Sequence, residues 1–399
     1  MKNIAIVNSC DWGSTGKISK AILKDFISKG YNAYFYYGRG GISNGIDSFR
    51  FENKFEIRIH ALLSRITGLQ GWYSRLATKR LIKYLINNSI DTVFLLSPHG
   101  YYLCEKYLYD YIIKSGIRLI YIMIDEYAYL GKCGAPLGCS NYKNYCKQCP
   151  KWNKYPESWF FDRSYDIFQM KLHAYSKMKN VLFVGPEFVV NNAKQSPLGD
   201  YMNLQILDEA IDLDLYKPVE TIELRRELGI KEHQIVFLCV APAKDEIKGA
   251  RFFVEAAKFF ADNDKMVFIH IGYNNNLSYS NKNFIPIEYI KNDGDLVKYY
   301  SMADLFVFPS LADTMSNTCI EALACGTPLL CFNISGMPYL LDETVGTLIP
   351  PQNVDSMINE IKKTVKKDDA TIQTCRRYAE KRYDKKHYSD KLIKIVSLL

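Results

Sequence analysis

The sequence predicts an α/β fold with two domains, each built around a parallel β-sheet. The chain has 399 residues, which is long for one ordinary hydrophobic core and suits two domains. Short apolar runs of buried-strand type alternate with amphipathic helical stretches, as in residues 4–8, 18–26 and 33–37. Strands joined by a crossover helix lie parallel, so we expect a helix-covered parallel sheet in each half.

The composition is ordinary for a globular protein, with 48% apolar and 24% charged residues. No apolar run reaches the roughly 18–20 residues that span a bilayer. Residues 2–7 predict a first strand rather than a signal peptide. We therefore expect a cytoplasmic protein, either free or on the inner face of the cytoplasmic membrane.

Positive charge is concentrated in the first half of the chain. Residues 1–200 hold 27 Lys and Arg against 15 Asp and Glu, whereas the remainder holds 24 against 28. A basic half suits an anionic partner such as lipid head groups or a lipid diphosphate, and a merely solvated surface is the alternative. Residues 78–86 form a basic amphipathic helix, a candidate for contact with the anionic inner leaflet. Nucleic acid is not expected as a partner.

Two loops that follow predicted strands in the first half carry candidate site residues. The loop after strand 4–8 is rich in small residues that let a ligand approach the backbone, and a tight turn is the alternative. Strand 92–96 delivers His99 at the strand end where α/β proteins bind ligands. This histidine is placed to bind or deprotonate a hydroxyl group, and a structural histidine is the alternative. The small residues of the first loop are Gly13, Ser14, Thr15 and Gly16.

Four cysteines lie close together in a loop rich in Gly, Lys and Tyr. Their spacing is Cys-x5-Cys-x6-Cys-x2-Cys, and they are Cys133, Cys139, Cys146 and Cys149. Four thiols in one short loop suit a tetrahedral structural zinc, although only the last pair has the ideal spacing. Free thiols and disulfides are the alternatives. Because no ligand position would stay open, a catalytic metal is not expected.

Lysines follow the first buried strand of the second half. Strand 235–240 leads into a loop that carries Lys244 and Lys248 ahead of an apolar helix. Two cations at this strand end are candidates for binding an anionic ligand, and no metal-binding acidic motif is evident. A solvated lysine at the start of a helix is the alternative.

Residues 305–332 are the stretch around which the second half is organised. A buried strand at 305–308 is followed by a polar loop and a short helix that ends at Gly326. Such a loop points backbone N–H groups and the positive helix end at the ligand crevice of the sheet, which predicts a diphosphate site. The residues expected to supply these N–H groups are Met315, Ser316, Asn317 and Thr318.

Two acidic residues flank the predicted diphosphate site. Asp313 lies in the loop and Glu321 inside the helix, eight positions later. Carboxylates in these places can accept hydrogen bonds from sugar hydroxyls on either side of a phosphate. The alternative is an acid that complements the helix dipole together with a solvated Glu.

The run from Asp313 to Pro328 also resembles a known signature. Asp-x7-Glu followed by Ala-Leu-Ala-Cys-Gly-Thr-Pro is similar to the acidic-x7-Glu motif of retaining nucleotide-sugar glycosyltransferases of family 4. The resemblance implies the GT-B fold, in which two Rossmann-like domains face a cleft and the C-terminal helix returns to the N-terminal domain. The first domain would cover residues 1–206, with a Cys-rich insert at about 131–150, plus helix 385–399; the second would cover 207–384.

The resemblance implies a role for each candidate of the second half. Asp313 would hold the donor sugar and Glu321 the ribose hydroxyls, while Lys248 would bind the diphosphate. The family's companion arginine is absent, so Lys244 would take its place. Backbone groups near Tyr289 and Ile290 would hold the base.

In the first half, the resemblance implies that residues 13–16 face the donor phosphates and that His99 serves the acceptor. Residues 67–102 resemble a subgroup that builds bacterial capsule, O-antigen and colanic-acid-type polysaccharides. The expected function is a retaining hexosyltransferase that moves a sugar from a UDP- or GDP-sugar to a glycan or lipid-linked saccharide. A nucleotide-sugar epimerase or hydrolase of the same fold is one alternative. A non-catalytic scaffold is another, because Ile124 stands where the family usually has His.

Overall fold

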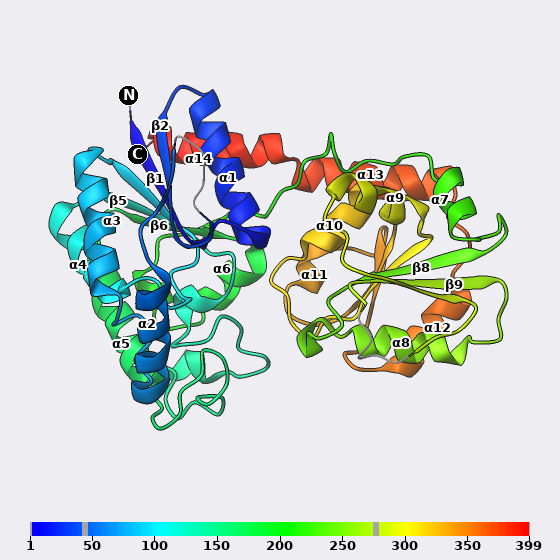
Figure 1. The fold of residues 1–399 in the computed structure, drawn as a ribbon, viewed down its shortest axis with the longest axis horizontal. Coiled ribbons are helices and arrows are strands. Elements are labelled where there is room, and N and C mark those ends of the chain that lie inside the picture. Colours follow the sequence, from blue (N-terminus) through cyan, green and yellow to red (C-terminus); the bar gives the residue numbers. More distant parts are fainter. Residues whose placement is uncertain (1, 42–46, 274–278, 399) are drawn as a thin grey trace. The chain divides into compact units, whose positions relative to one another are not determined.

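The computed structural model describes residues 2–41, 47–273 and 279–398, which divide into two compact units. Unit 1 runs to Leu207 and resumes at Ser389, and unit 2 is Asp208–Tyr388. Each unit has its own parallel sheet with helices packed on it (Figure 1). The divisions expected from the sequence lie after residues 206 and 384.

The sheet of unit 1 has the strand order β3-β2-β1-β4-β5-β6-β7, with every pairing parallel. The order reverses at β1, whose Ile6 pairs with Phe35 of β2 on one side and Phe94 of β4 on the other. The strands are β1 (Asn3–Cys10), β2 (Asn32–Arg39), β3 (Ser48–Arg50), β4 (Thr92–Leu95), β5 (Arg118–Ile122), β6 (Val181–Gly185) and β7 (Leu204–Ile206).

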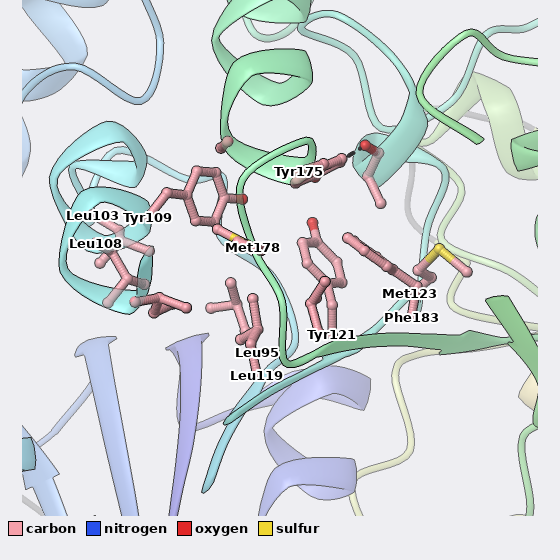
Figure 2. Close-up of a cluster of buried hydrophobic side chains, with 14 of the residues drawn as sticks. Leu95, Leu103, Leu108, Tyr109, Leu119, Tyr121, Met123, Tyr175, Met178 and Phe183 are labelled. Atoms are coloured by element: carbon pink, nitrogen blue, oxygen red, sulfur yellow. Dashed lines mark hydrogen bonds between the residues drawn. The ribbon is translucent and has the colours of Figure 1, made fainter. Parts of the chain in front are cut away.

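Aromatic side chains fill much of the core of unit 1. Figure 2 shows Tyr121 of β5 beside Phe183 of β6, with their ring centroids 5.4 Å apart, and Tyr175 packs edge-on against the same phenylalanine at 4.8 Å. The Tyr175 hydroxyl donates to the carbonyl of Ala128, so the buried polar group is satisfied. The helices of this unit are α1 (Gly13–Ser28), α2 (Lys54–Thr67), α3 (Arg75–Asn87), α4 (Glu105–Ser115), α5 (Ser164–Tyr175) and α6 (Glu187–Ala193).

The sheet of unit 2 has the order β10-β9-β8-β11-β12-β13, again with every pairing parallel. Alternate residues of β8 enter two cores, because Val236 and Leu238 join one apolar cluster and Phe237 and Cys239 the other. The strands are β8 (Ile235–Val240), β9 (Met266–Ile271), β10 (Phe284–Ile287), β11 (Leu305–Phe308), β12 (Leu329–Phe332) and β13 (Gly346–Ile349). The helices are α7 (Ile222–Glu227), α8 (Ala250–Phe259), α9 (Asp293–Met302), α10 (Asn317–Ala324), α11 (Met337–Leu340), α12 (Val354–Lys363) and α13 (Asp369–Tyr383).

The last helix, α14 (Lys385–Leu398), starts in unit 2 and ends in unit 1, as the sequence predicted for the C-terminal helix. The carbonyl of Val396 accepts hydrogen bonds from Lys2 Nζ at 2.5 Å and Arg118 Nη1 at 3.4 Å, and Ser389 donates to Asp25 of α1. Residue 399 of the predicted helix lies outside the described residues. Within the described ranges, every helix is too short or too polar to cross a membrane.

Candidate active site

Several candidate residues of each unit follow the strands at which its sheet reverses its order. In unit 1 the reversal lies between β1 and β4, and these strands lead into the start of α1 and the loop with His99. In unit 2 it lies between β8 and β11, which lead into the loops of Lys248 and Asp313. Open α/β sheets bind ligands outside the carboxyl ends of their strands at such a reversal.

Lys248 and Asp313 are in direct contact, although they come from different loops. Lys248 Nζ lies 2.7 Å from Asp313 Oδ2, and the two side chains are 34% and 15% exposed. Lys248 ends a short 3-10 helix, Glu246–Lys248, that Asp245 caps by accepting from the N–H groups of Ile247 and Lys248. The pair therefore joins the loop after β8 to the loop after β11.

Two glycines hold the Asp313 loop in place. Gly249 has φ +69°, and a Cβ there would lie 2.0 Å from the carbonyl oxygen of Pro309. A Cβ on Gly336 would lie 1.8 Å from the carbonyl oxygen of Thr314, and its N–H donates to the Asp313 carbonyl at 2.9 Å. No other residue type fits either place without moving backbone, so the loop carrying Asp313 is enclosed from two sides.

The helix α10 begins at Asn317, directly after Ser316. Ser316 is its N-cap, and the serine Oγ accepts from the N–H of Cys319 at 3.4 Å. The first-turn N–H groups of Asn317 and Thr318 have no intrahelical acceptor, which is the property that makes a helix start an anion site. Asn317 Oδ1 is buried and has no hydrogen-bond partner among the described residues. A buried acceptor without a partner suits a ligand that carries hydroxyl groups.

Glu321 is half-buried inside α10 rather than freely solvated. Its Oε2 accepts a hydrogen bond of 2.8 Å from the hydroxyl of Tyr300 in α9. Burial raises the pKa of Tyr300, and the charge of Glu321 raises it further, so this phenol stays protonated and donates. The carboxylate is thus oriented by a fixed donor.

Three further donor-side candidates of unit 2, Lys244, Tyr289 and Ile290, lie away from the Lys248–Asp313 contact. Lys244 makes no hydrogen bond or ion pair with the described residues, and its side chain lies in solvent. Tyr289 and Ile290 follow β10 in the loop before α9, with Tyr289 exposed and Ile290 half-buried. The structure gives no contact between these three residues and the Lys248–Asp313 pair.

His99 is paired with Asp125 in unit 1. Its Nε2 lies 2.6 Å from Asp125 Oδ2, and its ring centroid lies 5.0 Å from that of Tyr127. Asp125 Oδ1 also accepts from the N–H of Tyr127 at 2.9 Å, which fixes the carboxylate. Both side chains of the pair are half-buried. A carboxylate on one ring nitrogen sets the histidine tautomer and fixes the orientation of the imidazole.

Asp125 was missed as a site residue by the sequence interpretation. It follows β5, directly after Ile124, and the sequence pattern placed it only as the end of a strand. Glu209 was missed as well, and its backbone N–H lies 3.3 Å from the sulfur of Met315. Burial raises the pKa of Glu209 to about 8, the charges of Asp313 and Asp208 raise it further, and Lys248 lowers it. The sequence signal that could have marked Glu209 is its place in the acidic run of residues 208–214.

The small residues 13–16 form the first turn of α1, directly after β1. Gly13 has φ +69° with open space around it, whereas a Cβ on Gly16 would lie 2.5 Å from the backbone carbon of Asp11. Thr15 Oγ1 accepts from the side chain of Asn8 at 3.2 Å. Gly16 is therefore explained by local packing, while Gly13 and Ser14 are exposed to solvent.

All four clustered cysteines line one small cavity of about 20 Å³. They are free thiols, and as the side chains stand no three His, Cys, Asp or Glu residues in the described ranges are arranged to hold a metal ion. The donor set suits one zinc ion, provided that the thiols turn toward the cavity. The same segment lies against the His99–Asp125 pair, because the carbonyl of Gly134 accepts from the Glu126 N–H at 2.9 Å.

Comparison with known proteins gives the family of one segment. Residues 220–384 match the glycosyl transferases group 1 family. This match lies within unit 2 and includes the Lys248–Asp313 pair and the whole of α10. The group 1 domain therefore contains the predicted diphosphate site.

Two curated relatives share part of the sequence. A UDP-Gal:alpha-D-GlcNAc-diphosphoundecaprenol alpha-1,3-galactosyltransferase of Escherichia coli is 28% identical over 175 residues, 41% of this chain and 45% of that protein. A putative teichuronic acid biosynthesis glycosyltransferase of Bacillus subtilis is 30% identical over 139 residues, 35% of each protein. The matched part thus spans less than half the length of these relatives.

Solved structures show the fold over the whole chain. Sucrose-phosphate synthase from Thermosynechococcus elongatus superposes with a TM-score of 0.71 at 12% identity, covering 100% of this chain and 99% of that one. Anabaena HepE with UDP-glucose gives 0.68 at 13% identity with full coverage of both chains. The lipopolysaccharide glycosyltransferase WaaG gives 0.67 at 15% identity, covering 98% and 99%. The predicted GT-B fold is confirmed.

Proposed function

We propose that this chain is a retaining glycosyltransferase that moves a hexose from a nucleoside diphosphate sugar to a saccharide or lipid-linked saccharide in bacterial surface polysaccharide synthesis. The observation that carries the proposal is the Lys248–Asp313 pair beside the N-terminus of α10, inside the segment that matches the group 1 family. A cation, an acid and a helix start together suit a sugar diphosphate better than any of them alone.

The donor end of the proposed reaction uses residues of unit 2. Lys248 leaves Asp313 and binds the diphosphate, with the first-turn N–H groups of α10 on the same phosphates and exposed Lys244 as a second cation. Asp313 then accepts from the donor sugar, and Glu321 accepts from the ribose. Charge that develops on the departing diphosphate is stabilised without a catalytic metal ion.

The acceptor end uses the His99–Asp125 pair of unit 1. The new bond joins the acceptor oxygen to the anomeric carbon on the face from which the diphosphate leaves, and the anomeric carbon–oxygen bond to the diphosphate breaks. The acceptor hydroxyl proton passes to the His99 imidazole, whose positive charge Asp125 stabilises at 2.6 Å. No side chain stands out as a covalent nucleophile, which favours this front-face path.

The donor and acceptor classes rest on what relatives are named for. The relative from Escherichia coli is named for a UDP-Gal donor and a diphosphoundecaprenol-linked acceptor, and HepE was solved with UDP-glucose. We therefore infer a UDP-sugar as the first donor to test, with GDP-sugars as the alternative. A lipid-linked acceptor would place the enzyme at the inner face of the cytoplasmic membrane. The basic surface of α2 and α3 suits contact with anionic lipids there.

We also propose a structural zinc on Cys133, Cys139, Cys146 and Cys149. The support is that all four thiols line one cavity of single-ion size and that their segment packs beside Asp125. The ion would hold this loop, which is otherwise short of regular structure, next to the acceptor-side pair. It would have no part in the bond-making step.

The deciding experiment is calorimetric titration of UDP and GDP into the wild type, Lys248→Ala and Lys265→Ala. We expect one nucleotide to bind the wild type, at least tenfold weaker binding by Lys248→Ala because a charge-assisted contact is worth about 1.5–3 kcal/mol, and no change for the exposed control Lys265→Ala. Binding of neither nucleotide would favour the non-catalytic scaffold.

Product analysis separates the remaining alternatives. An epimerised or hydrolysed donor formed without any acceptor would favour the epimerase or hydrolase. Turnover of a radiolabelled donor by Glu321→Ala at the wild-type rate would contradict the role given to Glu321.

A further inference from the structure

Helix α2 exposes an apolar face that a helix of a globular domain would normally bury. Phe55, Ile59, Leu62 and Ile66 recur at spacings of four, three and four residues, and all are exposed, Phe55 by 71%. The opposite face of the same helix is buried through His60 and Ser64. Four large apolar residues in one line predict an apolar occupant. These four residues are called the α2 stripe below.

The stripe leads into a pocket of about 580 Å³ between α2 and the start of α3. This volume lies within the range of small-molecule sites, and the pocket has apolar walls formed by Ile59, Leu63, Trp72 and Leu76. Leu76 is 64% exposed, so the apolar surface continues out of the pocket onto α3. The other lining residues carry polar groups, and they are Glu56, His60, Tyr73, Ser74 and Arg75.

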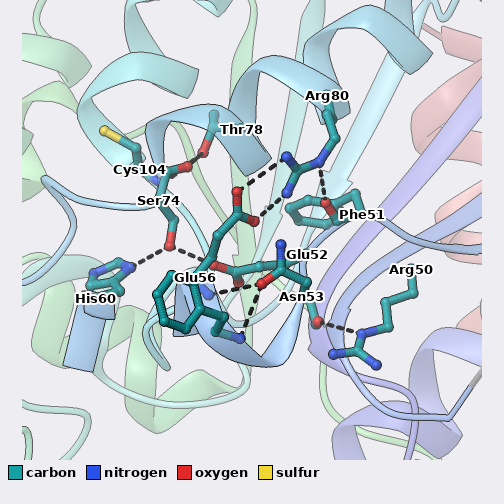
Figure 3. A network of polar contacts seen from close by, with 12 residues as sticks. Arg50, Phe51, Glu52, Asn53, Glu56, His60, Ser74, Thr78, Arg80 and Cys104 are labelled. Carbon is teal, nitrogen blue, oxygen red and sulfur yellow. Dashed lines mark hydrogen bonds and ion pairs between the residues drawn. The ribbon is translucent and has the colours of Figure 1, made fainter. Parts of the chain in front are cut away.

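The floor of the pocket is a fixed polar network (Figure 3). His60 Nδ1 lies 2.7 Å from Ser74 Oγ, and that hydroxyl donates to Glu52 Oε1 at 2.5 Å. Both His60 and Ser74 line the pocket. His60 Nε2 is buried and has no hydrogen-bond partner among the described residues, which is costly unless a ligand or water satisfies it. The pocket is thus rigid on one side and holds one unsatisfied polar atom.

Positive charge surrounds this apolar surface. Helices α2 and α3 carry seven Lys and Arg and a single acid, Glu56, which is itself paired with Arg80. Arg58, Arg75 and Lys79 are exposed, and Arg75 lines the pocket. An occupant that is apolar along its length and anionic at one end matches this combination.

The pocket is connected to the proposed acceptor residue. The ring of Tyr101 meets the ring of His60 edge-on, with centroids 5.8 Å apart, and Tyr101 is two residues beyond His99. Cys104, at the end of the same segment, contacts the carbonyl of Trp72 at 3.2 Å. A ligand whose chain fills the pocket would therefore present its head group on the side of the His99 loop.

We propose that this pocket binds the isoprenoid chain of a diphosphate-linked lipid acceptor, with Arg75 and its neighbouring cations on the diphosphate. The proposal rests on the proposed function, because it names the acceptor class of that enzyme. An isoprenoid is chosen over a flat bilayer surface because the site is a pocket as well as a stripe. The chain would lie along the α2 stripe, and the saccharide would extend toward His99.

The test is calorimetric titration with farnesyl diphosphate, a soluble isoprenoid diphosphate, and with inorganic pyrophosphate as the head-group probe. We expect the wild type to bind farnesyl diphosphate at least tenfold more tightly than pyrophosphate. Ile59→Asp and Leu76→Asp should each weaken farnesyl diphosphate binding at least tenfold, because a carboxylate replaces apolar contact and repels the diphosphate. Both residues are exposed, so the fold should persist, and circular dichroism melting checks this.

Ile222→Asp is the matched control, since Ile222 is 59% exposed on α7 of unit 2, and it should bind like the wild type. Equal affinity for the two probes would overturn the proposal. The proposal would also be overturned if the protein sedimented with phosphatidylglycerol vesicles in a Leu76-dependent way but did not bind farnesyl diphosphate. Self-association that Leu76→Asp abolishes would overturn it as well. Titration of UDP into the same samples distinguishes this proposal from the proposed function. If UDP binds and farnesyl diphosphate does not, only the isoprenoid pocket is overturned. If farnesyl diphosphate binds and UDP does not, only the donor assignment is overturned.

Discussion

Single residues show what a pattern can and cannot predict. Lys248 and Asp313 were each expected near a diphosphate, but they are 65 positions apart and nothing in either motif says that they touch. The sequence pattern placed Asp125 only at the end of a strand, because a carboxylate becomes the partner of His99 only when β4 and β5 lie side by side. Motif spacing reports on one loop, whereas a site is made by several.

Gly249 supplies a prediction at this scale, because it allows Lys248 to approach the Asp313 loop. We expect Gly249→Ala to lower the free energy of unfolding by at least about 2 kcal/mol more than Gly229→Ala. Both glycines have φ +69°, but a Cβ on Gly229 meets nothing within 4 Å, whereas one on Gly249 lies 2.0 Å from the Pro309 carbonyl oxygen. Urea unfolding of the two variants measures the difference, and equal losses would show that the loop yields easily.

Elements were predicted well where local chemistry sets them. Ser316 is an N-cap residue type, and α10 begins directly after it. Helix α2 shows the limit of such predictions. A line of apolar residues at helical spacing normally marks the buried face, but the α2 stripe is exposed and His60 is buried instead. The pattern gives the helix and leaves open which of its faces meets the core.

The buried His60 predicts a pH dependence of stability. Burial lowers its pKa to about 3, so between pH 6.5 and pH 3 the unfolded chain takes up a proton that the folded chain does not. Stability should therefore fall as the pH drops from 6.5 to 5, by about 2 kcal/mol from this group. Urea unfolding of wild type and His60→Gln at pH 5 and pH 7 checks this. Glu52, whose pKa burial raises to about 9, contributes the opposite slope in both proteins; identical slopes would contradict the prediction.

The Cys-rich segment predicts a metal content. We expect protein made in zinc-containing medium to carry close to one zinc per chain by elemental analysis, because four thiols share one cavity. Cys146→Ser should lose the ion and lower the melting temperature, since the ligand set is then incomplete. Cys10→Ser is the control, because Cys10 lies outside the cavity. If the protein contained no metal and melted at the same temperature with and without added zinc, the zinc prediction would be wrong.

On the scale of the whole molecule, a parallel sheet in each half was predicted from length and from the alternation of strands and helices, and the GT-B fold that the resemblance implied is confirmed. The proposed chemistry is divided in the same way as the cores, with the residues proposed to bind the nucleotide diphosphate in unit 2 and His99 in unit 1. What the pattern could not supply is that the apolar face of α2 is exposed, because apolar residues at helical spacing normally mark a buried face.

This division predicts how a nucleotide changes the thermal unfolding. With UDP at about 100 times its dissociation constant, unit 2 should gain about 2.7 kcal/mol, so its calorimetric transition should move to higher temperature while that of unit 1 stays. Each unit has its own apolar core, which is the reason to expect separate transitions. A single transition that moves as a whole would show that the two units unfold cooperatively.

The return of α14 to unit 1 has a consequence for how the protein is made. Residues 389–398 leave the ribosome after all of unit 2, yet Val396 accepts hydrogen bonds from Lys2 and Arg118. The part of unit 1 before Asp208 is therefore synthesised before the segment that completes its surface. During that interval the nascent chain exposes the patch on which α14 will dock, and a ribosome that stalls before residue 389 would leave that patch uncovered.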